Sequence, residues 1–295
     1  MAPSTPDRPR HVAAYYEQCE IDYRLFWDLD HSLAMHMGHW DSTTCTLRDA
    51  LARQNRLLAE LGRISIADHV LDAGCGVGGS AIFLARTARA RVTGVTLSRH
   101  QAMTARAHAR RLGVAHDTDF LVMDYANTGF ANGTFDVFWA LESACYATDV
   151  YALAQEAFRV TRPGGRLVVA DGFAMDHPRD AASERILQRW MRGWALTSLA
   201  TVDQFGRALA LSGFGQVLFH DCTPNILSSS WRLYGHSLYG LPFGRFAELL
   251  RLRSRVQTGN IVGARAQRAV LRRGLACYGV FTARKPLSPV ASPSP

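Results

Sequence analysis

Short apolar runs alternate with helical segments through the middle of the sequence. Runs typical of strands lie at residues 69–74, 91–97, 119–124, 135–142 and 165–173. Helical patterns fill the intervals at residues 79–89, 98–112 and 149–161. This alternation is typical of a parallel sheet with helices on both faces. We therefore predict an α/β, Rossmann-like, doubly wound core over residues 63–173.

Residues 1–62 follow a different, helical pattern. Aromatic side chains are concentrated between Tyr15 and Trp27, and a turn-like stretch separates them from a second helix over residues 43–61. We predict an N-terminal helical cover here. Its aromatic helix fits either a lid or an arm exchanged between subunits, so we also consider a homo-oligomer joined through this helix.

The alternation breaks after Phe173. Helical patterns cover residues 178–199, 202–211 and 225–274, and strand patterns cover 215–222 and 277–285. The sheet then has seven strands, mostly parallel, with one antiparallel edge. We predict a helical lid over residues 174–274, which includes the sixth core strand, above the strand ends where such folds bind ligands. The last strand falls within 275–285, and the proline- and serine-rich tail 286–295 is expected to be disordered.

The charge balance is basic, and it changes this picture little. The protein has 33 basic and 25 acidic side chains, a formal net charge of +8, and a single lysine, Lys285. A basic surface fits nucleic acid or a diphosphate substrate as an anionic partner. The arginines at positions 245, 251, 253 and 255 lack the interleaved aromatic residues of a single-strand binder. We therefore predict no nucleic-acid partner and keep nucleic-acid binding as the weakest alternative.

The cysteine spacing and the hydropathy of the sequence indicate in which cellular compartment the protein is expected. The six cysteines are scattered, without a C-x-x-C pair or zinc-ligand spacing, so neither a disulfide framework nor a metal site is expected. The N-terminus has no apolar signal core, and no apolar run is long enough for a membrane span. We expect a soluble, cytoplasmic protein.

The most informative stretch is VLDAGCGVGG, from Val70 to Gly79. Its glycines also satisfy the dinucleotide pattern G-x-G-x-x-G, so a dehydrogenase has to be considered. Asp72 disfavours it, because a carboxylate at the strand end attracts an ammonium group and repels a pyrophosphate. The next strand ends at Ser98 without the acidic residue that binds an NAD ribose. A Tyr-x-x-x-Lys pair is also impossible with Lys285 as the one lysine. These features favour an amino-acid sulfonium donor.

Five segments then carry a family resemblance. VLDAGCGVGGS, VTGVTLSRHQ, MDYANTGF, FDVFWALESACYATD and RVTRPGGRLVVADGF resemble the class I methyltransferases. Within that class they are similar to the group of C-methyltransferases that act on sterols, tocopherols, cyclopropane lipids and prenyl chains. The resemblance covers residues 12–173 closely and the remainder loosely. It implies S-adenosyl-L-methionine as the cofactor, S-adenosyl-L-homocysteine as its product, and no metal.

The resemblance also implies which residues bind the donor. The glycines lie against its methionine portion, the end of the second strand replaces the acidic ribose ligand, and the end of the third strand borders the adenine. An N-terminal tyrosine closes over the donor, and a leucine ends the fourth strand beside the sulfonium. With Asp72 at the ammonium group, the predicted set is Tyr16, Asp72, Gly74, Gly76, Thr96, Ser98, Gln101, Asp124, Tyr125 and Leu141.

The methylated atom is predicted from a shorter segment. Glu142 and Tyr146 match the E-S-x-x-[HY] segment of prenyl and sterol C-methyltransferases. An alkene nucleophile leaves a carbocation, which a carboxylate and aromatic faces stabilise. We predict C-methylation of a prenyl or terpenoid chain in a small hydrophobic natural product, with Glu142, Tyr146 and His39 as catalytic residues. Aromatic residues of the lid are expected to bind the substrate: Trp190, Trp194, Trp231 and Tyr234.

Two alternatives stay open within the same architecture. O- or N-methylation of a phenol or amine requires a general base, and His36 or His39 is the candidate because both lie in the turn that the resemblance implies closes over the donor. A prenyl diphosphate as substrate would use the arginines of residues 245–255 and would bring magnesium with it.

Overall fold

The computed structural model describes residues 8–176 and 180–287, so the predictions for the first seven residues, for 177–179 and for the tail beyond 287 lie outside it. The protein divides into two compact units. A sheet unit comprises residues 56–171, 200–220 and 279–295, and a helical unit comprises residues 1–55, 172–199 and 221–278. Most of the predicted N-terminal cover and of the predicted lid lies in the helical unit.

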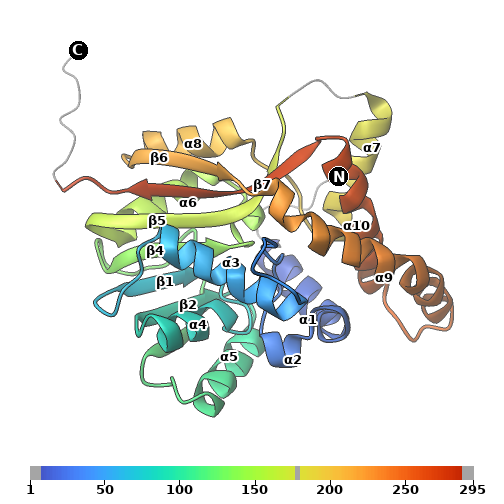
Figure 1. Cartoon of the computed structure of the whole chain (residues 1–295), viewed down its shortest axis with the longest axis horizontal. Coiled ribbons are helices and arrows are strands. Elements are labelled where there is room, and N and C mark those ends of the chain that lie inside the picture. The colour runs from blue at the N-terminus through green and yellow to red at the C-terminus, as the bar shows by residue number, and fades with distance from the viewer. Residues whose placement is uncertain (1–7, 177–179, 288–295) are drawn as a thin grey trace. The chain divides into compact units, whose positions relative to one another are not determined.

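The strands within the described residues form one seven-stranded sheet (Figure 1). Its strands are β1 (His69–Ala73), β2 (Arg91–Thr96), β3 (Thr118–Val122), β4 (Phe135–Leu141), β5 (Thr161–Ala174), β6 (Gly215–Asp221) and β7 (Ala276–Arg284). Their spatial order is β3-β2-β1-β4-β5-β7-β6. Every residue of β4 is buried, as expected for a central strand covered on both faces. The predicted doubly wound α/β fold is confirmed.

The strand order reverses between β1 and β4, and this reversal positions the site. Strand β1 pairs in parallel with both β2 and β4, so the connections run outward from it in two directions. Ligands bind at such a switch point, beyond the carboxyl ends of the strands. Asp72 lies opposite Gly94 of β2 and Trp139 of β4, one residue before the end of β1.

The antiparallel strand is not at the edge of the sheet, where we predicted it. The amide of Gly164 donates to Lys285, and the amide of Met175 donates to Leu275, so β7 runs against β5. Strand β7 therefore lies between β5 and the edge strand β6. The connection between β6 and β7, residues 222–275, is long enough for β7 to enter the sheet between β5 and β6 instead of adding to its edge.

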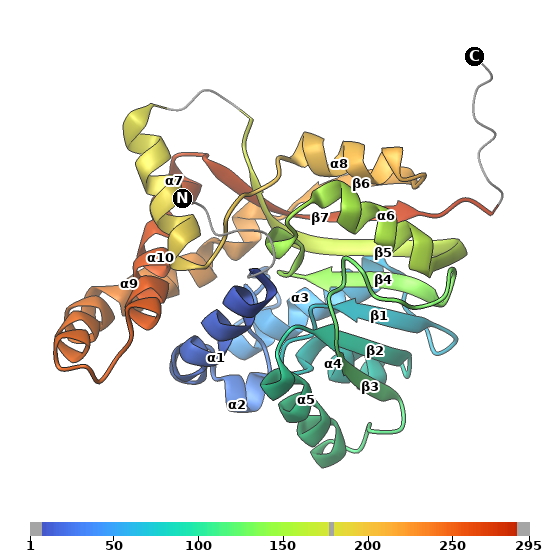
Figure 2. The same ribbon diagram turned by 180° about the vertical axis from the view of Figure 1, so that it is seen from behind.

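The sheet unit contains helices on both faces of the strands. They are α4 (Gly79–Thr87), α5 (Arg99–Arg111), α6 (Val150–Val160) and α8 (Val202–Leu211). Helices α6 and α8 pack together in front of the sheet in Figure 2. Helix α6 ends at Val160 and β5 begins at the next residue, so the helix ends one residue before the predicted bound of 161.

The helical unit contains α1 (Arg8–Trp27), α2 (Leu29–Ser32), α7 (Ala181–Gly193), α9 (Thr223–Leu249) and α10 (Arg255–Arg272), and α3 (Leu47–Leu61) runs from this unit into the other. Helix α10 packs against α7, α9 and α1. Gly193 of α7 and Gly263 of α10 allow these two helices to approach closely, because a Cβ on Gly193 would lie 2.5 Å from the Gly263 Cα. Arg253 forms a 2.6 Å ion pair with buried Asp22 of α1. None of the helices in the described ranges combines the length and apolar character needed to cross a bilayer.

Candidate functional site

The turn between β1 and α4 is built on glycines with positive φ. Gly74, Gly76 and Gly78 have φ values of 96°, 52° and 88°. The amide of Gly74 donates a 3.0 Å hydrogen bond to the carbonyl oxygen of Val95, which ties the turn to β2. A Cβ on Gly74 would lie 2.3 Å from the Ser143 Cβ. Glycine is therefore required at position 74 by the neighbouring strand end as well as by the backbone conformation.

The carboxyl group of Asp72 is buried, and one of its two oxygens makes no hydrogen bond within the described residues. Its exposed fraction is 2%, and its Oδ2 atom has no hydrogen-bond partner among the described residues. Burial raises the pKa of Asp72 to about 7, and a hydrogen bond from the Ala81 backbone opposes that rise. A buried acceptor without a donor is costly unless a ligand supplies one. The ammonium group of S-adenosylmethionine fits that requirement in charge and in hydrogen-bonding capacity.

The end of β2 forms a closed polar cluster. The Thr96 hydroxyl donates a 2.6 Å hydrogen bond to the Gln101 side-chain oxygen, and the Gln101 amide donates to the Ser98 hydroxyl oxygen at 3.1 Å. Ser98 is the N-cap of α5. The structure thus brings together the three residues predicted to replace the acidic ribose ligand.

The end of β3 carries the two residues predicted to border the adenine. Asp124 is exposed, and its Oδ1 accepts a 2.9 Å hydrogen bond from the Ala126 amide. Tyr125 is buried, and its hydroxyl donates to the Ser143 carbonyl oxygen at 2.6 Å. Tyr125 therefore also links the third strand to the end of the fourth.

Glu142 follows directly after β4 in an unusual backbone conformation. Its φ is 52°, a left-handed value that costs a non-glycine residue free energy and that often marks a functional position. Its amide donates a 2.8 Å hydrogen bond to Ala170 of β5. Leu141 before it is buried, and a single 3-10 turn, η2 (Ala144–Tyr146), follows. This arrangement sets Glu142 and Tyr146 at one strand end, as the sequence predicts.

Asp171 is a buried acidic residue that the sequence reasoning missed. It follows Ala170 in β5, and its Oδ2 accepts a 2.9 Å hydrogen bond from the Cys145 amide in η2. Burial raises the pKa of the Cys145 thiol, and the negative charge of Asp171 adds to the effect. The available signal was one carboxylate within the apolar run LVVADGF. Asp171 holds the turn that carries Tyr146.

The remaining predicted residues lie in the helical unit. Tyr16 stacks on Tyr23 in α1 with ring centroids 5.8 Å apart. Trp190 and Trp194 form an edge-to-face pair at 5.6 Å in and just after α7. Trp231 and Tyr234 of α9 flank the Arg268 guanidinium, which lies 3.6 Å from the Trp231 ring centroid. The four predicted substrate aromatics are thus two separate pairs.

The two candidate histidines differ in what their rings contact. His36 is buried, with Nδ1 2.9 Å from the Met37 carbonyl and Nε2 3.2 Å from the Asn55 amide nitrogen, so both ring nitrogens are engaged. Burial lowers the pKa of His36 to about 4. The His39 Nδ1 atom is buried and has no hydrogen-bond partner among the described residues. Burial lowers the pKa of His39 too, with a contribution from Arg53. Of the two, only His39 has a buried ring nitrogen without a hydrogen-bond partner among the described residues.

Comparisons with known proteins agree with this geometry. The family described as "Methyltransferase domain" matches residues 71–169. The O-methyltransferase cnsE of Penicillium expansum is 32% identical over 198 residues, which are 66% of this protein and 70% of that one. The 27-O-demethylrifamycin SV methyltransferase of Amycolatopsis mediterranei (strain S699) is 28% identical over 254 residues, 85% of this protein and 90% of that one.

A solved structure extends the likeness across almost the whole protein. The geranyl diphosphate C-methyltransferase of Streptomyces coelicolor A3(2), in complex with Mg2+, geranyl-S-thiolodiphosphate and S-adenosyl-L-homocysteine, is 25% identical. Its TM-score is 0.73, and the match spans 97% of the present protein and 100% of the solved one.

Proposed function

Because the protein belongs to the class I S-adenosylmethionine-dependent methyltransferases, we propose that it methylates a carbon atom of a prenyl or other terpenoid chain in a small hydrophobic metabolite. The observation that carries the proposal is the Glu142 carboxylate, held in a strained backbone conformation at the carboxyl end of β4. The C-methyltransferase among the structural relatives supports the same reaction class.

The donor, when bound, supplies a methyl group attached to a positively charged sulfur. Loss of the methyl group leaves that sulfur as a neutral thioether. The π electrons of a substrate double bond form the new carbon–carbon bond, and a carbocation remains on the neighbouring carbon. We assign Glu142 the role of stabilising that cation and accepting the proton whose loss restores a double bond. Positioning supplies most of the remaining acceleration, since a direct displacement requires the reacting atoms within about 3–3.5 Å.

Other residues have supporting roles in this proposal. Asp72 binds the ammonium end of the donor through its unsatisfied oxygen. Asp171 and Tyr125 hold the segment after β4 through the Cys145 amide and the Ser143 carbonyl.

The test replaces Glu142 by glutamine, which keeps the shape and removes the charge. Donor binding, measured by calorimetry with S-adenosylhomocysteine, is expected to stay within about twofold, and turnover of geranyl diphosphate or a related prenyl compound is expected to fall at least about 100-fold. Glu184→Gln, on α7, is the matched control and keeps full activity. An unchanged rate in the Glu142 variant removes this residue from the mechanism.

O-methylation is the second candidate, and the His39 ring favours it. Its buried Nδ1 atom has no partner among the described residues, and the 32% identical relative from Penicillium expansum is named as an O-methyltransferase. The product made with a labelled methyl donor is analysed by mass spectrometry before and after treatment with hydriodic acid, which removes a methyl group from an ether or ester oxygen and leaves one on carbon in place. Loss of turnover in His39→Asn with a phenolic acceptor supports the second candidate.

A further inference from the structure

Helix α9 is apolar on two faces, and only one of them is covered. Its buried residues recur at three- and four-residue spacing and include Ile226, Leu233, Leu241 and Ala247. A second set of apolar side chains on another side of the same helix is open to solvent, Tyr239, Phe243 and Phe246, and the exposed C-cap residue Leu250 follows them. Tyr239 is 83% exposed and Phe243 is 73% exposed. A helix at the surface of a globular domain normally carries polar residues on this side.

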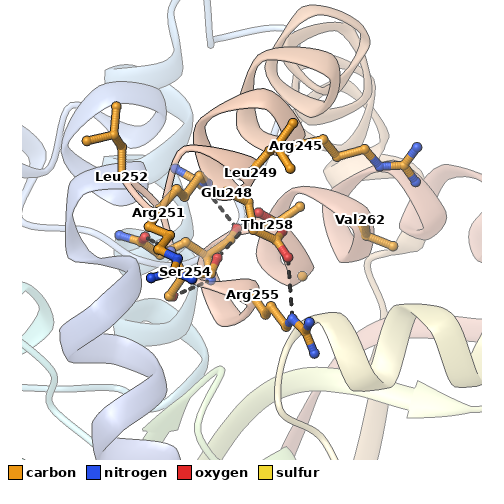
Figure 3. Close-up of a pocket in the computed structure, with 12 residues that line it drawn as sticks. Arg245, Glu248, Leu249, Arg251, Leu252, Ser254, Arg255, Thr258 and Val262 are labelled. Atoms are coloured by element: carbon orange, nitrogen blue, oxygen red, sulfur yellow. Dashed lines mark hydrogen bonds and ion pairs between the residues drawn. The ribbon is translucent and has the colours of Figure 1, made fainter.

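The exposed stripe continues into the turn between α9 and α10. Leu249 and Leu252 are 79% and 78% exposed. Figure 3 shows Leu249 at the end of α9 and Leu252 on the turn, with Arg245 of α9 and Arg255 of α10 among the neighbouring side chains. Contiguous exposed apolar side chains of this size mark a surface that binds another apolar surface. We call Tyr239, Phe243, Phe246, Leu249, Leu250 and Leu252 the α9 apolar stripe.

The charges around the stripe are almost all positive. Residues 222–260 contain five arginines, at positions 232, 245, 251, 253 and 255, and a single acidic residue, Glu248. Glu248 lies 3.6 Å from Arg255, and Arg253 is paired with Asp22. The side chains of Arg245 and Arg251 form no hydrogen bond or ion pair with any residue that the structure describes.

An open hollow of about 990 Å3 lies at the same turn. Arg245, Arg251, Arg253 and Arg255 line it, together with Leu249 and Leu252 (Figure 3). Basic side chains beside exposed leucines and aromatics are the composition of a segment that lies in the interface of an anionic bilayer, with apolar groups inserted and arginines at the headgroup phosphates. Arginine suits phosphate because its guanidinium donates two parallel hydrogen bonds.

A second copy of the protein fits this surface less well. A twofold interface brings the same patch of each subunit together, so the arginines of one stripe would face those of the other. One glutamate, already beside Arg255, cannot neutralise that repulsion. An anionic surface, by contrast, attracts these positively charged arginines.

We propose that the α9 apolar stripe and the arginines of the α9–α10 turn dock the protein peripherally on an anionic lipid bilayer. Docking of this kind requires no membrane-spanning helix. It is independent of which atom the enzyme methylates, so its failure would leave the proposed function untouched.

The test uses the full-length protein and flotation with vesicles. Vesicles of phosphatidylcholine with phosphatidylglycerol are expected to carry the protein at low salt, and vesicles of phosphatidylcholine alone are expected to leave most of it behind. Arg245→Gln and Arg251→Gln should each weaken binding about fivefold. The double variant Phe243→Ser, Phe246→Ser should weaken it at least about tenfold. The matched control is Leu211→Ser on α8, where the side chain is 77% exposed and outside the stripe, and it should bind like the unaltered protein.

Four results would overturn the proposal. The first is absence of binding to the anionic vesicles, and the second is equal binding by the stripe and arginine variants. The third is a dimer, detected by light scattering, that Phe243→Ser dissolves, since the stripe would then be a subunit interface. The fourth is release from vesicles by millimolar glycerol phosphate, which would assign the arginines to a soluble anion. Because the substituted side chains are exposed, thermal unfolding of every variant is expected to match that of the unaltered protein.

Discussion

The Tyr125 hydroxyl donates a 2.6 Å hydrogen bond to the carbonyl oxygen of Ser143. This bond joins the segment after β3 to the segment after β4, and Ser143 directly follows the strained Glu142. The Ser143 hydroxyl in turn donates to the carbonyl oxygen of Ala73 at the end of β1. The ends of three strands are thus connected around the proposed reacting position.

Removing that hydroxyl should affect catalysis more than folding. In Tyr125→Phe the ring stays and the buried Ser143 carbonyl loses its donor, so the free energy of unfolding should fall by about 1–3 kcal/mol. Turnover should fall more than donor affinity, because the segment that carries Glu142 is loosened. Urea unfolding and steady-state kinetics measure both quantities. Tyr151→Phe, at an exposed position on α6, serves as the control and should change neither.

Alanine at Gly74 should be far more damaging than alanine at Gly113. Both glycines have left-handed φ values, 96° and 74°, so both substitutions strain the backbone by about 1–2 kcal/mol. A Cβ at Gly74 also collides with the Ser143 side chain, whereas a Cβ at Gly113 meets nothing within 4 Å. The Gly74 variant should therefore be less stable than the Gly113 variant by a further ~1–3 kcal/mol. Equal loss of stability in chemical unfolding would contradict the steric role of position 74.

Donor binding should strengthen as pH rises toward 7. The pKa of Asp72 is about 7 in the free protein, and the ammonium group of the donor attracts the ionised form. Below that pH a proton must leave before the pair forms, so affinity should fall about tenfold per pH unit. Calorimetry with S-adenosylhomocysteine from about pH 5.5 to about 7.5 measures this slope. Asp72→Asn should bind weakly and with no slope, and a slope retained in that variant would assign the titration to another group.

The pH dependence of stability should change when His36 is replaced. The folded-state pKa of about 4 lies below the usual 6.5, so the unfolded protein takes up a proton that the folded protein excludes. His36 therefore costs stability as pH falls from about 6.5 to about 4, by roughly 3 kcal/mol in full. Asp72 acts in the opposite direction, because its raised pKa removes stability as pH rises from about 4 to about 7.

The difference between His36→Gln and the unaltered protein isolates the histidine. The variant should lose less stability than the unaltered protein between about pH 7 and about pH 5, in urea unfolding at each pH. If plots of the unfolding free energy against pH ran parallel for the two proteins, the folded protein would take up a proton on His36 as readily as the unfolded protein.

The apolar runs of the sequence, five within the alternating region and two after it, predicted all seven strands of the sheet to within a few residues. The exception is β5, which begins at Thr161, ahead of the predicted start at 165. Local periodicity predicts conformation well where a strand or helix is long and buried on a regular face. The glycine turn was also predictable, because its backbone conformation and the carboxylate before it are encoded within one short segment.

Properties that depend on distant segments were not predictable in this way. Nothing near Gly74 in the sequence reveals that Ser143 occupies the space of its missing side chain. The bond from the Cys145 amide to Asp171 joins two strand ends whose proximity requires the finished sheet. His36 and His39 lie close together in the same turn, yet only His36 has both ring nitrogens engaged.

The order of the amino acids was therefore enough to predict the α/β architecture, the glycine turn after β1 and the family, since these follow from local periodicity and from motifs contained in single segments. The order of β7 and β6, the partners of the buried polar groups and the uncovered face of α9 emerged only from the folded molecule. Which side of an apolar helix is buried depends on the surfaces that meet it, and those surfaces come from residues far away in sequence.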